Sequence, residues 1–281
     1  MVISVALFTL QERKVLGYIQ TRKGPNKPGP LGLLVPFADA IKLLTKQNRI
    51  PNQSNKILFF GVPILTIMIP FMLWSVYPSL LEIISFKYSV IWFICVSSVG
   101  VYGILGAGWG SNRKYSLIGA VRSVAQSVSY EVVLTLIIIH YIIFYHYKLI
   151  NTKIIPLGVF LFFVMILMFL STLAETNRSP FDFSEGESEL VRGFNTEYSS
   201  IPFILIFLAE YISILFISIL VSLAYNIRGY IDVFLFMTVW ALAYIWCRGT
   251  LPRLRYDQLI YIAWKRILPI VLCRTAAVSI L

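Results

Sequence analysis

Acidic residues that can exchange protons are concentrated in one stretch of the sequence, Ala174 to Ser199, which reads AETNRSPFDFSEGESELVRGFNTEYS. Acids that lie close together and partly out of water raise one another's pKa values, which suits groups that load and release protons near neutral pH. The alternative is an acidic loop simply neutralised by arginines, and the residues alone leave both interpretations open. Six of the chain's thirteen Asp and Glu lie here: Glu175, Asp182, Glu185, Glu187, Glu189 and Glu197.

Two further acids interrupt apolar runs. Glu210 lies about ten residues into the run from Ile201 to Tyr225, and Glu131 lies near the start of a long helical pattern that extends from Tyr115 to about Tyr145. Ionised carboxylates are costly in hydrocarbon, so acids inside membrane spans are rare and usually functional. We therefore interpret both residues as functional rather than as structural hydrogen-bonding groups.

Composition identifies a polytopic membrane protein. The chain is 58% apolar with a mean hydropathy of +0.79, and charged residues make up 13%, against about 25% in soluble domains. The net charge of +11 does not indicate nucleic-acid binding, because the basic residues are spread over short connections between apolar runs.

Metal and redox chemistry are not predicted for this chain. Cys95, Cys247 and Cys273 stand singly inside apolar runs without C-x-x-C spacing, which excludes a disulfide framework and an iron–sulfur or zinc motif. His140 and His146 are six positions apart and so lie on different faces of a helix. Any electrons would therefore have to be handled by a partner.

The periodicity predicts an all-α integral membrane protein, one polytopic domain over residues 1–281, with about eight transmembrane helices. One interfacial amphipathic helix is expected between the first two spans, from Leu33 to Lys46, with apolar residues at positions 34, 37, 41 and 44. The first and last spans are short. The spans are expected at residues 2–10, 57–81, 88–109, 115–145, 154–173, 201–224, 230–247 and 267–281.

Charge bias orients these spans. Eight spans place residues 11–56, 107–131, 174–200 and 247–266 on one side, and these segments hold 19 of the 24 Lys and Arg. The positive-inside rule assigns them to the matrix or cytoplasmic side. The acidic stretch therefore shares that side with the Gly/Pro-rich basic segment Gly17 to Pro36, which alone would be interpreted as a surface loop.

Five blocks in this order resemble the signatures of a known family, that of NADH–ubiquinone oxidoreductase chain 1, the quinone-site membrane subunits of respiratory complex I. The resemblance covers nearly the whole chain. The blocks are Glu12 to Asn26 (ERKVLGYIQTRKGPN), Pro36 to Thr45 (PFADAIKLLT), Ser127 to Glu131 (SVSYE), Ala174 to Ser199, and Arg248 to Leu259 (RGTLPRLRYDQL).

The resemblance implies eight transmembrane helices and a chamber that opens to lipid and admits ubiquinone as substrate. It implies a subunit of an H⁺-translocating NADH:ubiquinone reductase with no redox centre and no cofactor of its own, since FMN and iron–sulfur clusters are expected in partner subunits. The implied partners are the peripheral-arm iron–sulfur and quinone-site subunits and the small and antiporter-like membrane subunits. The implied location is the mitochondrial inner membrane, or a bacterial plasma membrane if the source is prokaryotic.

Roles for individual residues follow from the same resemblance. We hypothesise that reduction or movement of quinone perturbs the protonation of the group Glu185, Glu187 and Glu197, and that Glu131 and Glu210 pass this change inward. The quinone path would be lined or shaped by Arg13, Arg22, Asp39, Arg178, Phe181, Arg253 and Arg255. The proton-coupling acids would be Glu131, Glu175, Asp182, Glu185, Glu187, Glu197 and Glu210.

Some features depart from the family pattern. Arg192 stands where the acidic loop usually has a small residue, and Arg274 lies inside the last predicted span. The family normally has a complete first helix before its Glu-Arg-Lys, and the end of this chain is short as well. We therefore expect a separate small membrane chain to pack at one or both ends.

Other functions remain as alternatives. A cation/proton transporter would carry ions on Glu131 and Glu210 without quinone; it would show an inverted repeat, and no such internal similarity is found. A membrane anchor of a hydrogenase-type redox complex would share the acidic stretch but lack a quinone pocket. A purely structural scaffold would not explain why Glu131 and Glu210 lie inside membrane spans.

Overall fold

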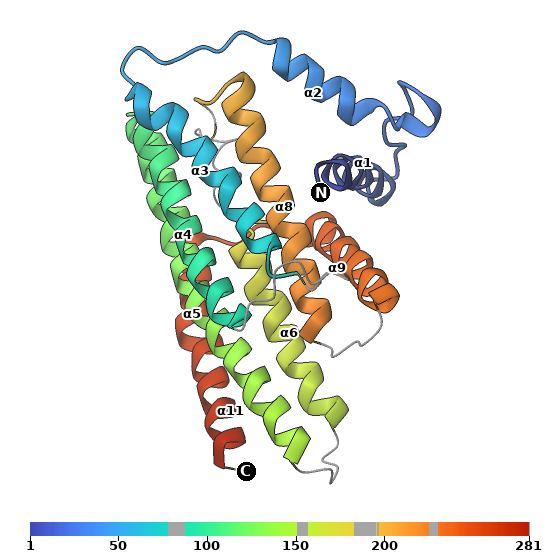
Figure 1. Ribbon diagram of the computed structural model, residues 1–281, viewed down its shortest axis with the longest axis vertical. Helices are drawn as coiled ribbons and strands as arrows, with labels where there is room; N and C mark the ends of the chain where they lie inside the picture. The colour runs from blue at the N-terminus through green and yellow to red at the C-terminus, as the bar shows by residue number, and fades with distance from the viewer. Residues whose placement is uncertain (78–87, 151–156, 183–194, 196, 225–229, 281) are drawn as a thin grey trace.

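The computed structural model describes residues 1–77, 88–150, 157–182, 195, 197–224 and 230–280, and every regular element in these ranges is a helix. Figure 1 shows a steep bundle with the C-terminus at its lower end and one helix, α2 (Val35–Thr45), across its upper end. The bundle contains α3 (Lys56–Trp74), α4 (Ser89–Gly110), α5 (Lys114–Ile150), α6 (Leu157–Glu175) and α8 (Ser200–Ala224). Beside it lie α1 (Val2–Ile19), α9 (Tyr230–Thr250) and the C-terminal α11 (Leu268–Ile280).

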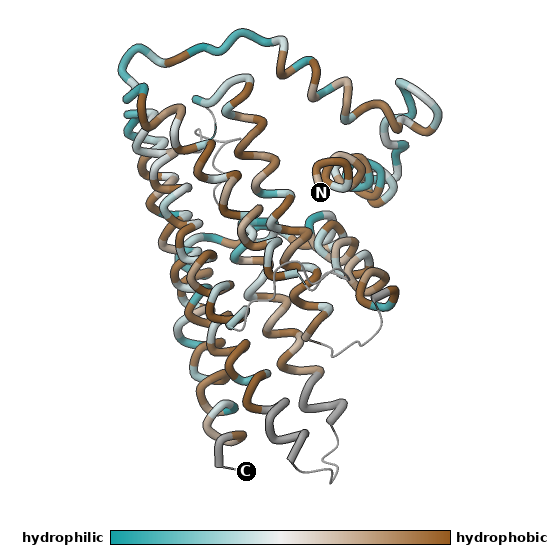
Figure 2. Tube along the Cα trace, viewed as in Figure 1, coloured by the Kyte–Doolittle hydropathy of each residue, from teal (hydrophilic) through white to brown (hydrophobic). Residues whose placement is uncertain are grey.

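Five of these helices are long and apolar enough to cross a membrane: α3, α4, α8, residues 114–143 of α5 and residues 231–250 of α9. Figure 2 shows apolar residues along the bundle and hydrophilic residues gathered in the connection between α2 and α3 at its upper end. The prediction of an all-helical, multi-pass membrane protein agrees with this architecture. The count of about eight spans remains a prediction, because the apolar helix found within α6, Phe162–Glu175, is shorter than the five spans and α1 carries charges.

The first helix extends beyond its predicted end at Leu10. It continues through Glu12, Arg13 and Lys14 to Ile19, which makes it about 27 Å long at 1.5 Å per residue. The helix tolerates these charges because the carboxylate of Glu12 is buried against two arginines from other parts of the chain. The Gly/Pro-rich residues that follow form the connection to α2, as predicted.

The amphipathic helix is confirmed between the first two long helices. It spans Val35–Thr45, and its apolar side chains Leu34, Phe37, Ile41 and Leu44 are exposed on the protein surface. A helix with this pattern suits the boundary between lipid headgroups and hydrocarbon.

The C-terminal helical segment begins earlier than the predicted start at Ile267. It starts with α10 (Tyr256–Tyr261) and passes through a π-helical turn at Ile262–Ile267 before α11. Leu259, Ala263 and Ile267 are buried, and their spacing of four residues places them on one face of the helix. The segment is helical from Tyr256 because this face has a partner: the hydroxyl of Tyr130 in α5 donates a hydrogen bond to the Leu259 carbonyl at 3.1 Å.

Glycines in the second half of α4 allow close helix packing. A methyl group at Gly103 would lie 2.7 Å from Thr66 Cγ2 in α3, and one at Gly106 would lie 2.8 Å from Val62 Cγ2. A methyl group at Gly108 would overlap the Cβ of Ala120 in α5. These contacts support close packing, rather than a backbone hinge, as the reason for the Gly-rich sequence.

We expect Gly108→Ala to lower the stability of the protein by about 1–3 kcal/mol, because the added methyl meets a side chain that cannot rotate away. Gly61→Ala is the matched control, since nothing lies within 4 Å of that position and alanine favours the helix. The thermal midpoints of the two variants in detergent test this expectation. Equal midpoints would show that α4 and α5 can separate without cost.

Candidate functional site

Two internal spaces lie on opposite sides of α8. The first, which we call the apolar groove, has a volume of about 630 Å³ and lies between α1, α2 and α8. The second, the acid cavity, has a volume of about 160 Å³ and lies among α3, α4, α5, α8 and the end of α6. The groove is lined by residues that include Val5, Ala6 and Leu16 of α1, Pro36, Ala40 and Leu43 of α2, and Phe203, Phe207 and Leu208 of α8.

Charged and hydrogen-bonding side chains also line the apolar groove. Glu12, Arg13, Asp39, Tyr211 and Arg248 all contribute to its surface. Arg13 donates a hydrogen bond to Asp39 at 2.7 Å, and this ion pair joins α1 to α2 with about half of each side chain exposed. The groove thus combines apolar walls with a limited set of polar groups, as small-molecule sites usually do.

Glu12, Arg178, Tyr211 and Arg248 form a charge cluster beside the groove. The guanidinium of Arg178 lies 3.4 Å from Glu12 Oε1, and Arg248 contacts the same oxygen. The Tyr211 hydroxyl donates to Glu12 Oε2 at 2.7 Å, and the Arg178 guanidinium lies 4.6 Å from the centre of the Tyr211 ring. Glu12 and Arg178 are only 6% and 5% exposed. One carboxylate therefore holds two guanidinium groups, which leaves the cluster with a formal charge of +1.

Four separate elements supply this cluster. Glu12 comes from the middle of α1, Tyr211 from α8, Arg248 from the end of α9, and Arg178 from the turn that follows α6. Gln126 of α5 fixes that turn, because its Nε2 donates to the carbonyls of Ala174 and Phe181 at 3.1 and 2.8 Å. The Ala174 carbonyl at the end of α6 also accepts the backbone N–H of Asn177 at 3.3 Å, so the Gln126 amide adds a second hydrogen bond there.

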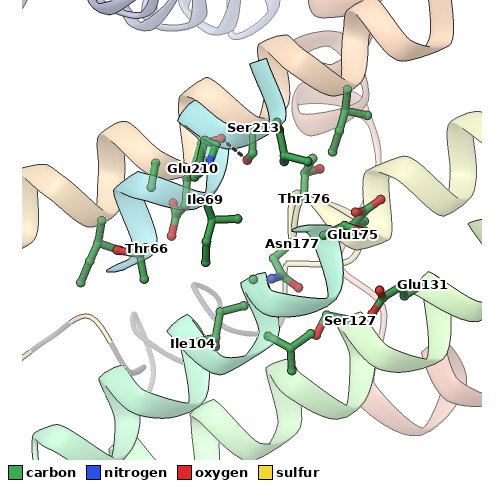
Figure 3. A pocket seen from close by; sticks show the side chains of 18 of the residues that line it. Thr66, Ile69, Ile104, Ser127, Glu131, Glu175, Thr176, Asn177, Glu210 and Ser213 are labelled. Atoms are coloured by element: carbon green, nitrogen blue, oxygen red, sulfur yellow. Dashed lines mark hydrogen bonds between the residues drawn. The ribbon is translucent and has the colours of Figure 1, made fainter. Parts of the chain in front are cut away.

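The acid cavity brings together three of the predicted proton-coupling residues, Glu131, Glu175 and Glu210 (Figure 3). The Glu175 carboxylate points toward the side of the cavity that holds Glu131, and Glu210 lies across from them. The buried atoms Glu175 Oε2 and Asn177 Oδ1 have no hydrogen-bond partner among the described residues. Buried polar atoms are almost always satisfied, and a cavity of about 160 Å³ is large enough to hold water beside them.

Helix α8 is the wall between the two spaces. Glu210 and Tyr211 are consecutive, and successive side chains on a helix point about 100° apart. Glu210 accordingly lines the acid cavity, while Tyr211 lines the groove and bonds Glu12. A change in charge or geometry at Tyr211, on the groove side of α8, therefore occurs next to Glu210, on the side of the acid cavity.

The other predicted residues have different surroundings. Phe181 is buried with its ring 5.7 Å from that of Tyr130, and Asp182 is buried outside both spaces. Glu197 lies 3.9 Å from Arg113 near the start of α5. Arg22, Arg253 and Arg255 are exposed and line neither space, while Glu185, Glu187, Glu189 and Arg192 lie outside the described residues.

Sequence reasoning did not identify Glu12, Tyr211 and Arg248 as functional residues. Glu12 and Arg248 are the first residues of two of the sequence blocks, whereas Tyr211 lies within an apolar run. The sequence does contain a signal for this pair. Glu12 lies at the end of one apolar run and Arg248 at the end of another, and their opposite charges favour an ion pair between the two helix ends. In the described part of the chain, no group of three His, Cys, Asp or Glu side chains is arranged to hold a metal.

Comparison with known proteins finds relatives along nearly the whole chain. Residues 1–279 match a family model described as NADH dehydrogenase. A protein of Aedes aegypti named NADH-ubiquinone oxidoreductase chain 1 is 50% identical over 274 residues, which cover 95% of this chain and 88% of the relative. Proteins with the same name from Locusta migratoria and Branchiostoma lanceolatum are 48% and 45% identical, with the same coverage of both chains.

Proposed function

The chain belongs to the NADH dehydrogenase family, and its relatives named NADH–ubiquinone oxidoreductase chain 1 indicate a membrane subunit of respiratory complex I. From this premise we propose a function for each of the two spaces. The apolar groove receives ubiquinone. The acid cavity couples the reduction of ubiquinone to proton movement. The proposed location is the mitochondrial inner membrane.

The observation that carries this proposal is the apolar groove with the charge cluster beside it. Ubiquinone has an apolar tail and a ring with two carbonyl oxygens, which accept hydrogen bonds. The apolar side chains of α1 and α8 suit the tail, and the guanidinium of Arg248, which has several N–H donors, suits a ring oxygen. The volume of about 630 Å³ is within the usual range for a small-molecule site.

The charge cluster responds to the chemistry of the bound quinone. Reduction of ubiquinone to ubiquinol takes up two electrons and two protons, and negative charge develops on the ring oxygens before the protons arrive. The electrons come from partner subunits. The guanidinium groups of Arg178 and Arg248 stabilise the developing charge, and their attraction to it weakens their hold on Glu12.

Coupling then crosses α8. A change at Glu12 acts on Tyr211, and the adjacent Glu210 faces Glu131 and Glu175 in the acid cavity. Water held at the buried polar atoms of the cavity links these carboxylates for proton transfer. In this proposal, the change in charge at Glu12 drives proton translocation, because it acts through Tyr211 and small movements of α8 on the carboxylates of the acid cavity.

Filling the groove tests this function directly. Ala40 lines the groove, whereas Ala38 is an exposed residue of the same helix that does not line it. We expect Ala40→Trp to lower kcat/KM for ubiquinone by about tenfold or more, since overpacking a site by a ring costs about 1–3 kcal/mol and about 1.4 kcal/mol is tenfold. Ala38→Trp serves as the matched control and should stay near the wild-type value.

The measurement is quinone reduction by NADH in the isolated complex, with a water-soluble electron acceptor used in parallel to measure NADH oxidation upstream of the groove. The second activity should be unchanged in both variants. Equal quinone reduction in the two variants would remove the groove from the quinone path. It would then favour the transporter alternative, in which the acid cavity carries ions without a quinone.

A further inference from the structure

Two serines at the start of α8 bind the segment that ends α2. The hydroxyl of Ser200 lies 3.0 Å from the Leu43 carbonyl and 2.8 Å from the Lys46 carbonyl, so its single hydrogen is shared between these two acceptors. Ser199 Oγ accepts a hydrogen bond from the Arg49 backbone N–H at 3.1 Å and approaches the Arg49 carbonyl as a donor at 3.3 Å. Since the last carbonyls of a helix have no partner within it, Ser200 caps α2 from outside.

The backbone at Ser200 is held in an unusual conformation. Its φ of +57° lies in the left-handed region, which is unfavourable for residues other than glycine, and the residue is 1% exposed. Such a conformation persists where the surroundings enforce it. Here Tyr198 anchors the segment, because its ring stacks on Phe59 at 4.4 Å and its hydroxyl donates to the Ala107 carbonyl at 3.1 Å.

The serine pair is placed to control one end of the apolar groove. Leu43 lines the groove with its side chain while its carbonyl accepts the Ser200 hydrogen bond, and Phe203 lines the groove from α8 three residues after Ser200. The pair thus links the two walls at their ends. The Arg13–Asp39 ion pair between α2 and α1 is about half exposed, and exposed pairs contribute little to stability, about 0–1 kcal/mol.

We propose that Ser199 and Ser200 act as a latch that positions α2 against α8, so that ubiquinone enters a groove whose walls are already in place. This inference rests on the proposed function. With the latch, the ordering of α2 is completed when the protein folds. Without it, each ubiquinone must order α2 as it binds, and the affinity falls. The serines are positioning residues, because they touch α2 and not the reacting atoms.

The effect should appear in KM. One neutral hydrogen bond contributes about 0.5–1.5 kcal/mol, so we expect each hydroxyl to change KM for ubiquinone by about two- to tenfold. kcat should stay within about twofold of wild type, because the reacting atoms keep their neighbours. A general loss of structure would instead lower the amount of active complex and kcat.

The variants separate the hydroxyl from the backbone strain. Ser200→Ala removes the hydroxyl and keeps the strain, whereas Ser200→Gly removes both, so an equal rise in KM assigns the effect to the hydroxyl. Ser98→Ala is the matched control, because the Ser98 hydroxyl donates to the Cys95 carbonyl of its own helix, at 2.8 Å. If the Ser200 variants fail to assemble, Ser199→Ala tests the more exposed of the two ties.

The assay is ubiquinone reduction by NADH in the isolated complex, together with hydrogen exchange at residues 35–45. We expect a raised KM and faster amide exchange in α2 for the latch variants, and wild-type values for Ser98→Ala. Unchanged KM and exchange in active latch variants would overturn the latch, and so would a fall in kcat alone. Absence of quinone reduction in the wild-type complex would instead overturn the proposed function, while the exchange of α2 still tests the latch.

Discussion

Glu12→Gln is expected to have the largest effect on the amount and stability of the assembled complex, with a loss of about 3–5 kcal/mol. The Glu12 carboxylate contacts two guanidinium groups, and that of Arg178 is buried. Glutamine keeps an oxygen that can accept the Tyr211 hydrogen bond but removes the negative charge. Two guanidinium groups would then lie near each other without the negative charge of Glu12 between them, and the Arg178 guanidinium is buried. The level of assembled complex on native gels and its thermal midpoint measure the loss.

Asp39→Asn is the matched control for this prediction. It also removes a carboxylate paired to an arginine at short distance, but both side chains of the Arg13–Asp39 pair are about half exposed. Water replaces the lost partner there, so the expected cost is about 0–1 kcal/mol. Equal losses in the two variants would show that burial of Glu12 is not what makes its ion pairs important.

Glu210→Gln is expected to separate electron transfer from proton translocation. The groove and the charge cluster remain intact in this variant, so NADH should still reduce ubiquinone, at a lower coupled rate. Glutamine cannot take up and release a proton, and a group that transfers protons contributes about 10²- to 10⁴-fold to a rate. We therefore expect proton translocation per NADH oxidised to fall by at least about tenfold in proteoliposomes.

The control for Glu210 is Asp232→Asn, which removes an acid that is exposed in the first turn of α9 and lines neither space. Its ratio of protons to NADH should equal that of wild type. Normal translocation by Glu210→Gln would remove Glu210 from the proton path. A parallel loss in both variants would point to general leakiness of the reconstituted protein.

Local patterns of the sequence were sufficient to locate most of the helices. The apolar runs predicted at residues 57–81, 88–109 and 201–224 correspond to α3, α4 and α8, although residues 78–81 of the first of these runs lie outside the described part of the chain. The amphipathic α2 followed from four apolar positions. These elements could be predicted because a run of apolar side chains, or a period of 3.6, is a property of neighbouring residues.

Helix ends that depend on distant contacts could not be predicted. The charges of Glu12, Arg13 and Lys14 indicated that the first span ends, yet α1 continues to Ile19 because Arg178 and Arg248 neutralise Glu12. The segment from Tyr256 is helical because its apolar face packs near Tyr130 of α5. At the end of α1 and at the start of α10, a contact with a residue far along the chain therefore decides where the helix ends or begins.

The sequence by itself determined that this is a helical membrane protein of the NADH dehydrogenase family, and it marked Glu131, Glu175 and Glu210 as candidates. Only the tertiary structure decided that these three acids share one cavity and that Tyr211 faces away from it toward Glu12. The partners of Glu12 are 166 to 236 positions away along the chain. No local pattern encodes such pairs, because they depend on how α1, α8, α9 and the turn after α6 pack together.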